Sequence, residues 1–240
     1  MIQTTKSVGE LAAEIPGATR VFSKLGIDFC CGGKQSLADA CAAVHYLVAE
    51  AAAQLESAAR IPLKEGERDW NTAPLGEIVN YIIERHHAFT REQLAILGKL
   101  MIQVQAAHSA NHPELSEMSR TLQNISHELS MHMMKEEQIL FPYLVEMERA
   151  MQFKKPLEPP MFGTVQNPIR MMMLEHDSAG AELETIRTLT KGFEVPADGC
   201  DSYRALYREF EALETDLHEH IHLENNILFP RAIRMEGEAL

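Results

Sequence analysis

The sequence predicts an all-α protein in which a small helical domain precedes an antiparallel four-helix bundle. Ala, Leu, Glu and Met are plentiful, whereas strand-like runs of Val, Ile and Tyr are scarce. Apolar residues recur at helical spacing from about residue 73 onward. A polar segment with a proline and a glycine divides the chain. We therefore expect a helical domain at 1–60, a linker at 61–72 and the bundle at 73–240.

Short helical patterns fill the N-terminal domain. Ser7 and Glu10 match a capping box, which predicts the start of a first helix. Gly26 fits the C-terminal end of a second helix, and Ser36 fits the N-cap of a third. The pattern thus predicts three short helices, with a loop between the second and the third.

That loop contains two adjacent cysteines, Cys30 and Cys31, followed by two glycines. Glycines allow the backbone to approach a partner closely, and the N-terminus of the next helix would favour a thiolate. The alternative is that both cysteines are small hydrophobic side chains at a turn. We do not expect a separate metal site, because adjacent cysteines chelate poorly and Cys41 is the only other thiol nearby.

Four longer amphipathic segments follow. The first begins after residues 71–74, where capping residues precede an early proline. The others are expected at about 113–149, 168–191 and 198–234, and the longest break, 151–167, is rich in proline and lysine. Connections of this length between amphipathic helices favour an antiparallel bundle.

One stretch of the bundle occurs twice. His132 and Glu136 precede Ile-Leu-Phe-Pro, and His220 and Glu224 precede the same four residues 88 positions later. On a helix, residues four apart share a face, so each copy directs one imidazole and one carboxylate the same way. The bundle therefore resembles a duplicated helix hairpin.

A second alignment adds one histidine to each half. A shift of 89 residues aligns His87 with His176 and keeps the downstream apolar residues in register, for example Leu94 with Leu183. Matching on the adjacent His86 loses this register. Neighbouring residues are about 100° apart on a helix, so only one of the two histidines can point straight into the core. We choose His87, and expect His86 to support the site or to be solvated.

Each half of the repeat thus contributes two histidines and one glutamate to a predicted metal site: His87, His132, Glu136, His176, His220 and Glu224. Four imidazoles and two carboxylates suit iron or manganese, and two carboxylates can bridge a pair of ions. Three histidines would suggest zinc, and ligation by oxygen alone would suggest calcium or magnesium. We predict two non-haem iron ions bridged by Glu136 and Glu224.

A single His–Glu pair at this spacing is usually a surface pair worth roughly 0.2–0.5 kcal/mol. Here two matched copies occur with two further repeat-related histidines. Burying these groups without a metal would leave charge and polarity uncompensated. The repeat therefore favours the metal site.

Other polar residues near the repeat give weaker signals. Glu128 and Asp216 lie one turn before His132 and His220, and Glu175 precedes His176. These acids could orient ligands, relay protons or pass iron, or they could be solvated. Three histidines lie outside the helix faces that contain the predicted ligands and are expected to be exposed: His127, His218 and His222. The sequence assigns no role to Trp70 or Cys200.

Composition limits the partners and the compartment. A formal net charge of −13 argues against binding to nucleic acid or to an anionic membrane. No window approaches the roughly 20 apolar residues of a membrane span, and no signal peptide is visible. The four cysteines form no disulfide framework, so we expect reduced thiols and a cytoplasmic protein.

These residues together resemble the iron–sulfur cluster repair di-iron proteins, the RIC (repair of iron centres) family. The resemblance spans nearly the whole chain and rests on the stretches 28–34, 132–142, 175–177 and 220–230. It implies a hemerythrin-like bundle in which four histidines and two bridging glutamates hold two irons. The six positions chosen above match that ligand set.

The resemblance implies a cytoplasmic stress protein, a homodimer, that restores iron–sulfur clusters damaged by nitric oxide or oxidants. It would act as an iron donor rather than as an enzyme, with damaged iron–sulfur proteins as its clients. The thiols of Cys30 and Cys31 could accept or hand on iron. Two alternatives stay open: a di-iron nitric oxide or peroxide reductase, with Glu128 or Glu175 supplying protons, and hemerythrin-like oxygen binding or sensing.

Overall fold

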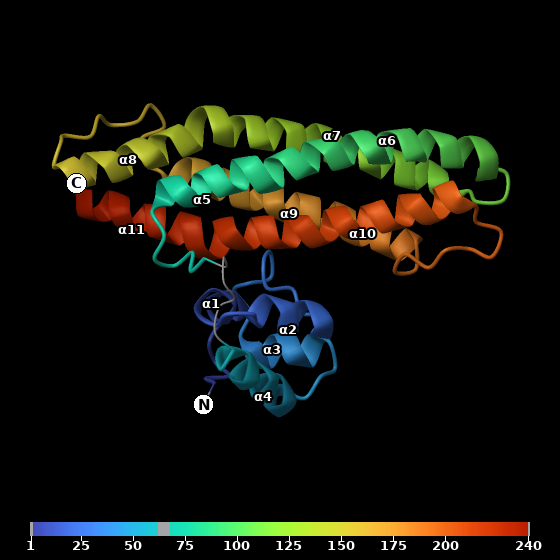
Figure 1. The fold of residues 1–240 in the computed structure, drawn as a ribbon, viewed down its shortest axis with the longest axis horizontal. Helices are drawn as coiled ribbons and strands as arrows, with labels where there is room; N and C mark the ends of the chain where they lie inside the picture. Colours follow the sequence, from blue (N-terminus) through green and yellow to red (C-terminus); the bar gives the residue numbers. More distant parts are fainter. Residues whose placement is uncertain (1, 62–67, 240) are drawn as a thin grey trace. The chain divides into compact units, whose positions relative to one another are not determined.

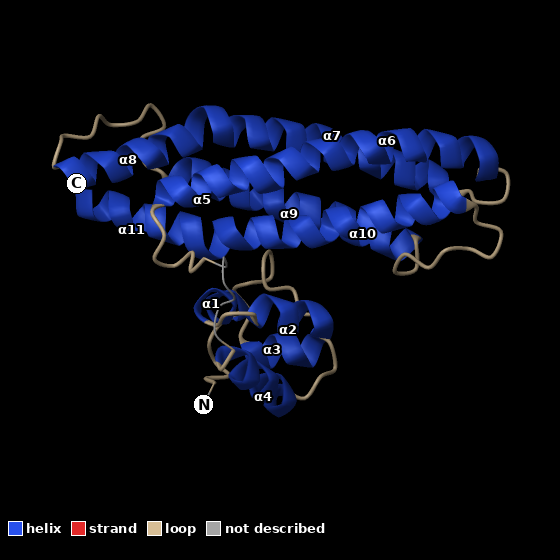
Figure 2. Cartoon of the chain, viewed as in Figure 1, coloured by secondary structure: helices blue, strands red, loops and turns tan. Residues whose placement is uncertain are grey.

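The computed structural model describes residues 2–61 and 68–239, and these residues form helices and no β-strand (Figures 1 and 2). The prediction of an all-α fold is confirmed. The predicted domain boundaries stay a prediction, and residues 62–67 of the expected linker lie outside the described residues. No helix within the described ranges is long and apolar enough to cross a membrane.

The chain divides into two compact units. The first comprises Met1–Val79, Leu144–Gln166 and His218–Leu240, and the second comprises Asn80–Tyr143 and Asn167–Leu217. Each unit contains its own core of buried apolar side chains.

The first unit begins with four short helices: α1 (Val8–Glu14), α2 (Ala18–Leu25), α3 (Leu37–Ala43) and α4 (Val48–Ala59). Ser7 and Glu10 form the predicted capping box of α1, and the hydroxyl of Ser36 caps α3. Gly26 ends α2 in the left-handed region, at φ 68°. The three helix signals of the sequence are thus confirmed.

The fourth short helix, α4, is not among those that the sequence predicts. Leu47 precedes it and its side chain makes no capping hydrogen bond, so the local signal of a helix start is missing. Its buried residues Ala51 and Leu55 pack into the same core as Phe22 and Leu37. The composition of α4, mostly Ala, Glu, Gln and Leu, favours a helix even without a cap, and the packing of its buried residues adds to that preference.

Four long helical runs form the bundle (Figure 1). They are α5 (Leu75–Tyr81) with η1 (Ile82–His87) and α6 (Ala88–His108); α7 (Glu114–Lys135) with η2 (Glu136–Leu140) and α8 (Phe141–Phe153); α9 (Gln166–Leu189); and α10 (Asp201–His222) with η3 (Leu223–Leu228) and α11 (Phe229–Ala239). The runs fall within a few residues of the predicted segments.

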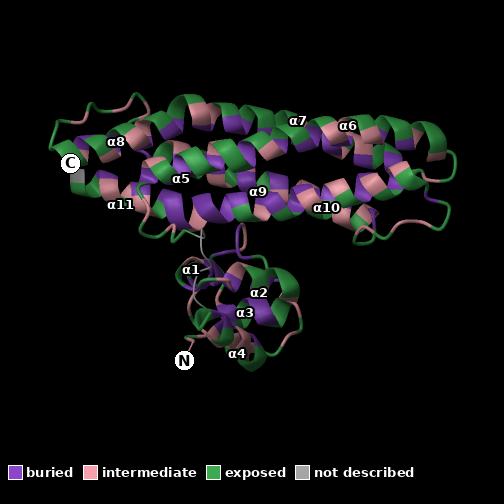
Figure 3. Cartoon of the chain, viewed as in Figure 1, coloured by how far each residue is buried: buried purple, intermediate pink, exposed green. Residues whose placement is uncertain are grey.

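The helices of the second unit enclose a continuous apolar core. Each contributes a fully buried side chain to it: Leu97 from α6, Ile125 from α7, Ile186 from α9 and Phe210 from α10. Buried positions recur along the inner side of these helices in Figure 3. This amphipathic pattern is the feature from which the sequence predicts a bundle.

The start of the first long run differs in detail from the prediction. The backbone N–H groups of Leu75 and Gly76 donate to the carboxylate of Glu148, at 2.6 and 2.9 Å. A side chain more than 70 residues away thus satisfies donors at the helix N-terminus, where a negative charge is favourable. The sequence predicts a local cap instead, because a sequence motif contains only nearby residues.

We expect Ile125→Ala to lower the free energy of unfolding by about 2–5 kcal/mol, because it removes a fully buried side chain and leaves a cavity. The matched control is Ile102→Ala, since Ile102 is 71% exposed. Urea unfolding measures both variants. Equal losses of stability in the two variants would contradict this description of the core.

Candidate metal centre

Three of the four long helical runs change to a π-helix at a predicted ligand. The π segments η1, η2 and η3 contain His87, Glu136 and Glu224, respectively. A π turn inserts one extra residue into a helix and is frequent at functional sites. The regular helical spacing of the apolar residues gives no sign of these turns.

Glu136 lies between two imidazoles. Its Oε2 is 3.3 Å from Nε2 of His87 and 3.3 Å from Nε2 of His132. Nε2 of His176 lies 3.1 Å from Nε2 of His132. All four side chains are buried. Three imidazole nitrogens and one carboxylate oxygen therefore meet in a space from which water is excluded.

The second copy of the repeated motif has the same local geometry. Nε2 of His220 is 3.0 Å from Oε1 of Glu224, and both side chains are buried. Two groups of four residues each hold their ligand atoms within 4.8 Å of one another: His87, Glu136, His220 and Glu224, and His132, Glu136, His176 and Glu224. The groups share both carboxylates.

These donors fit a metal ion. Two buried carboxylates facing imidazoles cost free energy unless a positive charge compensates them. Imidazole nitrogens and carboxylate oxygens are ligands that suit divalent transition metals. The structure brings the six predicted ligands together, and their role as ligands stays a prediction.

The other ring nitrogen of His87 contacts a second acid. Nδ1 of His87 lies 2.7 Å from Oε1 of Glu137, which also accepts a hydrogen bond from Arg91 at 2.6 Å. Burial alone would raise the pKa of Glu137, but the hydrogen bonds from Arg91 and His87 lower it overall. An ionised Glu137 fixes the ring of His87 with Nε2 directed at Glu136.

Glu175 has the same relation to His132. Its Oε2 is 2.9 Å from Nδ1 of His132, and Lys135 forms an ion pair with its other oxygen. Burial would raise the pKa of Glu175, whereas the hydrogen bonds from His132 and Lys135 lower it overall. Glu175 thus faces the histidine of the opposite helix rather than its neighbour in sequence, His176.

Asp216 and Glu128, which lie one helical turn before the predicted ligands His220 and His132, have different surroundings. Asp216 is buried and contacts Nδ1 of His86 at 3.0 Å and Arg85 at 3.4 Å. The sequence left open whether Asp216 and His86 are solvated. Both side chains are buried, so that alternative is wrong. Glu128 is exposed and accepts a hydrogen bond from Ser178.

Two family models match the chain. One is described as the hemerythrin HHE cation binding domain and matches residues 79–232, and the other, a domain of unknown function (DUF542), matches residues 4–59. The "Iron-sulfur cluster repair protein YtfE" of Pectobacterium atrosepticum is 42% identical over 236 residues, covering 98% of this chain and 100% of that protein. The protein of the same name in Escherichia coli O157:H7 is 39% identical over the same length.

The chain belongs to the YtfE iron–sulfur cluster repair family. The resemblance stated from the sequence is thereby confirmed. Residues 79–232 form a hemerythrin-type cation-binding domain, in agreement with the buried groups of histidine and glutamate. The predicted bundle and its N-terminal helical domain are confirmed with it.

In this member of the YtfE family, the DUF542 region packs against η3. The side-chain amide of Asn226 donates to the carbonyl oxygen of Phe29 at 2.9 Å. A Cβ atom on Gly9 would lie 2.3 Å from Oδ1 of Asn226 and 2.9 Å from the carbonyl oxygen of Gly33, so a larger residue at this position would have to displace them. Asn225 donates to the carbonyl oxygen of Cys30 at 3.4 Å. The loop with the two cysteines is thus tied to the helix of Glu224.

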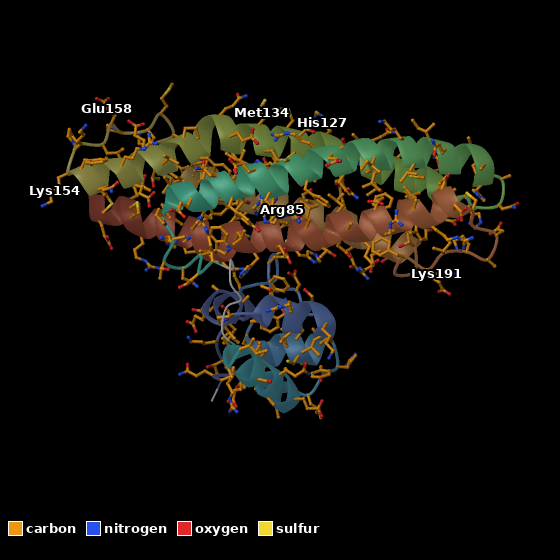
Figure 4. All side chains as sticks on the ribbon, in the orientation of Figure 1. Arg85, His127, Met134, Lys154, Glu158 and Lys191 are labelled. Carbon is orange, nitrogen blue, oxygen red and sulfur yellow. The ribbon has the colours of Figure 1, made fainter. Side chains whose placement is uncertain are left out.

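The prediction that His222 is exposed is wrong. Its ring is buried, 5.5 Å from the ring of Phe29, and Asn226 lies 3.0 Å from its Nδ1. Burial lowers the pKa of His222 to about 4, so the ring is neutral near pH 7. His218 is half-buried rather than exposed as predicted. His127 is exposed as predicted, on the outside of α7 in Figure 4.

The cysteine loop also differs from the expectation of a thiolate. Cys30 is buried, and a hydrogen bond with Cys31 together with burial raises the pKa of its thiol. Oδ1 of Asp28 accepts from the backbone N–H groups of Cys30 and Cys31 at 2.9 and 3.0 Å. Asp28, Cys30 and Cys31 form a further group of close ligand atoms. The sequence assigns Asp28 no role of its own, although it belongs to the stretch 28–34 on which the family resemblance rests.

We expect Glu137→Gln to weaken Fe²⁺ binding by roughly 10–100-fold. The neutral amide would replace the negatively charged carboxylate that contacts Nδ1 of His87 and would orient the ring less strongly. Equilibrium titration with Fe²⁺ without oxygen measures the affinity. Glu146→Gln, at a position of α8 outside both ligand groups, is the control and should bind as the wild type does. An unchanged affinity in Glu137→Gln would contradict this role.

Proposed function

We propose that this protein repairs damaged iron–sulfur clusters by donating iron from a di-iron centre. The relatives that span nearly the whole chain carry the name iron–sulfur cluster repair protein. The main structural support is the pair of buried four-residue groups that share Glu136 and Glu224. Two ions that share two carboxylates need this arrangement.

In this proposal two imidazoles and both carboxylates would hold each iron. His87 and His220 would hold one ion and His132 and His176 the other, because Glu136 and Glu224 belong to both groups. Each ion thus has one histidine from each half of the sequence repeat. Bound iron would supply an exchangeable Fe²⁺ for a cluster that has lost one.

The protein's own side chains set how readily iron leaves. Imidazole and carboxylate bind metal only when deprotonated, so protonation of either releases the ion. Glu137 and Glu175 oppose that release by keeping His87 and His132 aligned. Neither group contains a cysteine, the ligand that iron–sulfur clusters use.

The remaining parts of the proposal follow the family resemblance. Damaged iron–sulfur proteins are the clients, and nitric oxide or oxygen species are the small molecules that reach the centre. The protein acts in the cytoplasm as a homodimer, and Cys30 and Cys31 receive or pass on iron. Light scattering of the purified protein tests the dimer directly.

We expect protein purified without oxygen to contain about two iron ions per chain, as a bridged pair requires. Glu136→Ala and Glu224→Ala should each lose at least half of this iron, since each removes a ligand shared by both groups. Metal analysis by mass spectrometry measures the content, with Glu146→Ala as control. A single tightly bound zinc in the wild type at this centre would contradict the proposal.

Donation itself is tested with protein loaded with labelled iron and a dehydratase whose cluster has lost iron. We expect activity to return together with the label, and Glu136→Ala to restore neither. Recovery of activity without transfer of label would exclude donation. Sustained anaerobic conversion of nitric oxide to nitrous oxide would then favour the reductase alternative.

A further inference from the structure

A buried histidine–aspartate pair lies beside the candidate metal centre, and neither of its residues belongs to the two ligand groups. Nδ1 of His86 is 3.0 Å from Oδ2 of Asp216, and the two side chains are 2% and 5% exposed. A carboxylate only accepts hydrogen bonds, so Nδ1 of His86 carries the proton and donates it. Burial makes this hydrogen bond stronger than the same contact would be in water.

The surroundings fix both members of the pair. Oδ1 of Asp216 lies 3.4 Å from Nη1 of Arg85, so each carboxylate oxygen has a partner. Arg85, labelled in Figure 4, is half exposed and thus brings its positive charge from the solvent side. The ring of Tyr81 packs edge-on against the ring of His86, with centroids 5.4 Å apart.

Each member of the pair is next to a predicted ligand. His86 directly precedes His87 in η1, and Asp216 lies one helical turn before His220 in α10. His87 and His220 belong to the same ligand group. The pair therefore connects the two helices whose imidazoles would hold one of the two ions, and we call this the His87 position.

The sequence repeat does not reproduce the pair in its other half. The shift of 89 residues aligns His86 with Glu175, and the shift of 88 residues aligns Asp216 with Glu128. Two carboxylates cannot form a hydrogen bond with each other, since both only accept. The second ion, which His176 and its partner histidine on α7 would hold, thus has acids at both of these places.

Glu175 and Glu128 instead contact groups nearer to solvent. Glu175 is 27% exposed; it contacts His132 and forms an ion pair with Lys135, which is 32% exposed. Glu128 is exposed and accepts a hydrogen bond from Ser178. Exposed ion pairs are screened by water and salt and contribute little to stability. We call the ion site that these contacts flank, between α7 and α9, the His132 position.

The acids that contact ligands directly do not make this difference. Glu137 contacts His87 and Glu175 contacts His132, one acid for each ligand group, and these acids are 26% and 27% exposed. Across the part of the chain that the structure describes, the buried pair is the contact that distinguishes the His87 position from the His132 position.

We propose that the two positions differ in how firmly they hold iron, and that His86 and Asp216 are positioning residues for the firmer one. Iron at the His87 position is retained, and iron at the His132 position is released first. This inference rests on the proposed function, since it names which ion of the di-iron centre is donated.

The physical reason is the freedom of the ligand helices. A chelator removes iron by replacing the protein ligands one at a time, and an imidazole that leaves must turn or shift. The buried hydrogen bond fixes η1 against α10 at the residue next to His87, and so limits that movement. Loss of a contact that orients a metal ligand weakens binding roughly 10–100-fold, which is enough to separate two release rates.

The experiment follows the release of iron from the full chain. Protein is loaded without oxygen with about two equivalents of Fe²⁺, and excess ferrozine then takes up the iron in a coloured complex. We expect two phases of equal amplitude whose rates differ roughly 10-fold or more. Release of both irons in one phase would overturn this inference and leave donation intact. Protein that binds no pair of irons would overturn the proposed function itself.

Ligand variants assign the phases. His176→Ala should keep one iron that leaves at the slow rate, because the His87 position is intact. His220→Ala should keep one iron that leaves at the fast rate. The reverse assignment would overturn the proposal.

The pair itself is tested with Asp216→Leu, which removes the acceptor. The slow phase should become roughly 10-fold faster while the fast phase stays the same. Asp216→Asn, whose side-chain oxygen still accepts from Nδ1 of His86, should keep most of the slow phase. Glu128→Leu, at the repeat-related position, is the matched control and should leave the slow phase unchanged. Equal acceleration of both phases in Asp216→Leu would contradict a positioning role.

NMR of the metal-free protein with ¹⁵N-labelled histidine gives a readout that does not depend on iron. The proton on Nδ1 of His86 should exchange slowly with water in the wild type and in Asp216→Asn, and rapidly in Asp216→Leu. The thermal midpoint shows that each variant is folded. Rapid exchange in the wild type would overturn the proposal, because the pair would then not be fixed.

Discussion

The burial of two carboxylates among four imidazoles is the constraint on which the bundle depends. Glu136 and Glu224 are fully buried, although an ionised carboxylate is among the most costly groups to remove from water. The long helices of a bundle are one of the few architectures that can direct ligands inward from several sides. The π turns at His87, Glu136 and Glu224 adjust those directions locally while the flanking helices continue.

Charged residues surround this centre in two layers, an inner layer of acids and an outer layer of basic residues. Glu137 and Glu175 contact the outward nitrogens of His87 and His132, and Arg91 and Lys135 in turn contact these acids. Each acid is thereby kept ionised against the effect of burial. Orientation of the imidazoles thus rests on ion pairs that lie at the edge of solvent.

The helix of Glu224 links the centre to the N-terminal helices. Three consecutive residues make this link, since Glu224 joins the buried ligand groups while Asn225 and Asn226 donate to the loop of Phe29 and Cys30. The neutral, buried ring of His222 packs against Phe29 beside them. A displacement of the cysteine loop would therefore act on a helix that contains the predicted ligand Glu224.

Features that depend on neighbours in the chain follow from the sequence alone. Helix caps at Ser7, Gly26 and Ser36 result from local backbone chemistry, and the apolar spacing predicts the long helices. The repeat also identifies the six residues that the structure brings together, because residues four apart share a helix face whatever the fold.

Contacts between distant segments, in contrast, required the folded chain. The fold groups His87 with His220 and His132 with His176, across the two halves that the repeat keeps apart. It buries His222, His86 and Asp216, and it holds Cys30 as a thiol. The reason is physical, because burial and charge pairing depend on which surfaces meet, and a pattern along one chain does not contain that information.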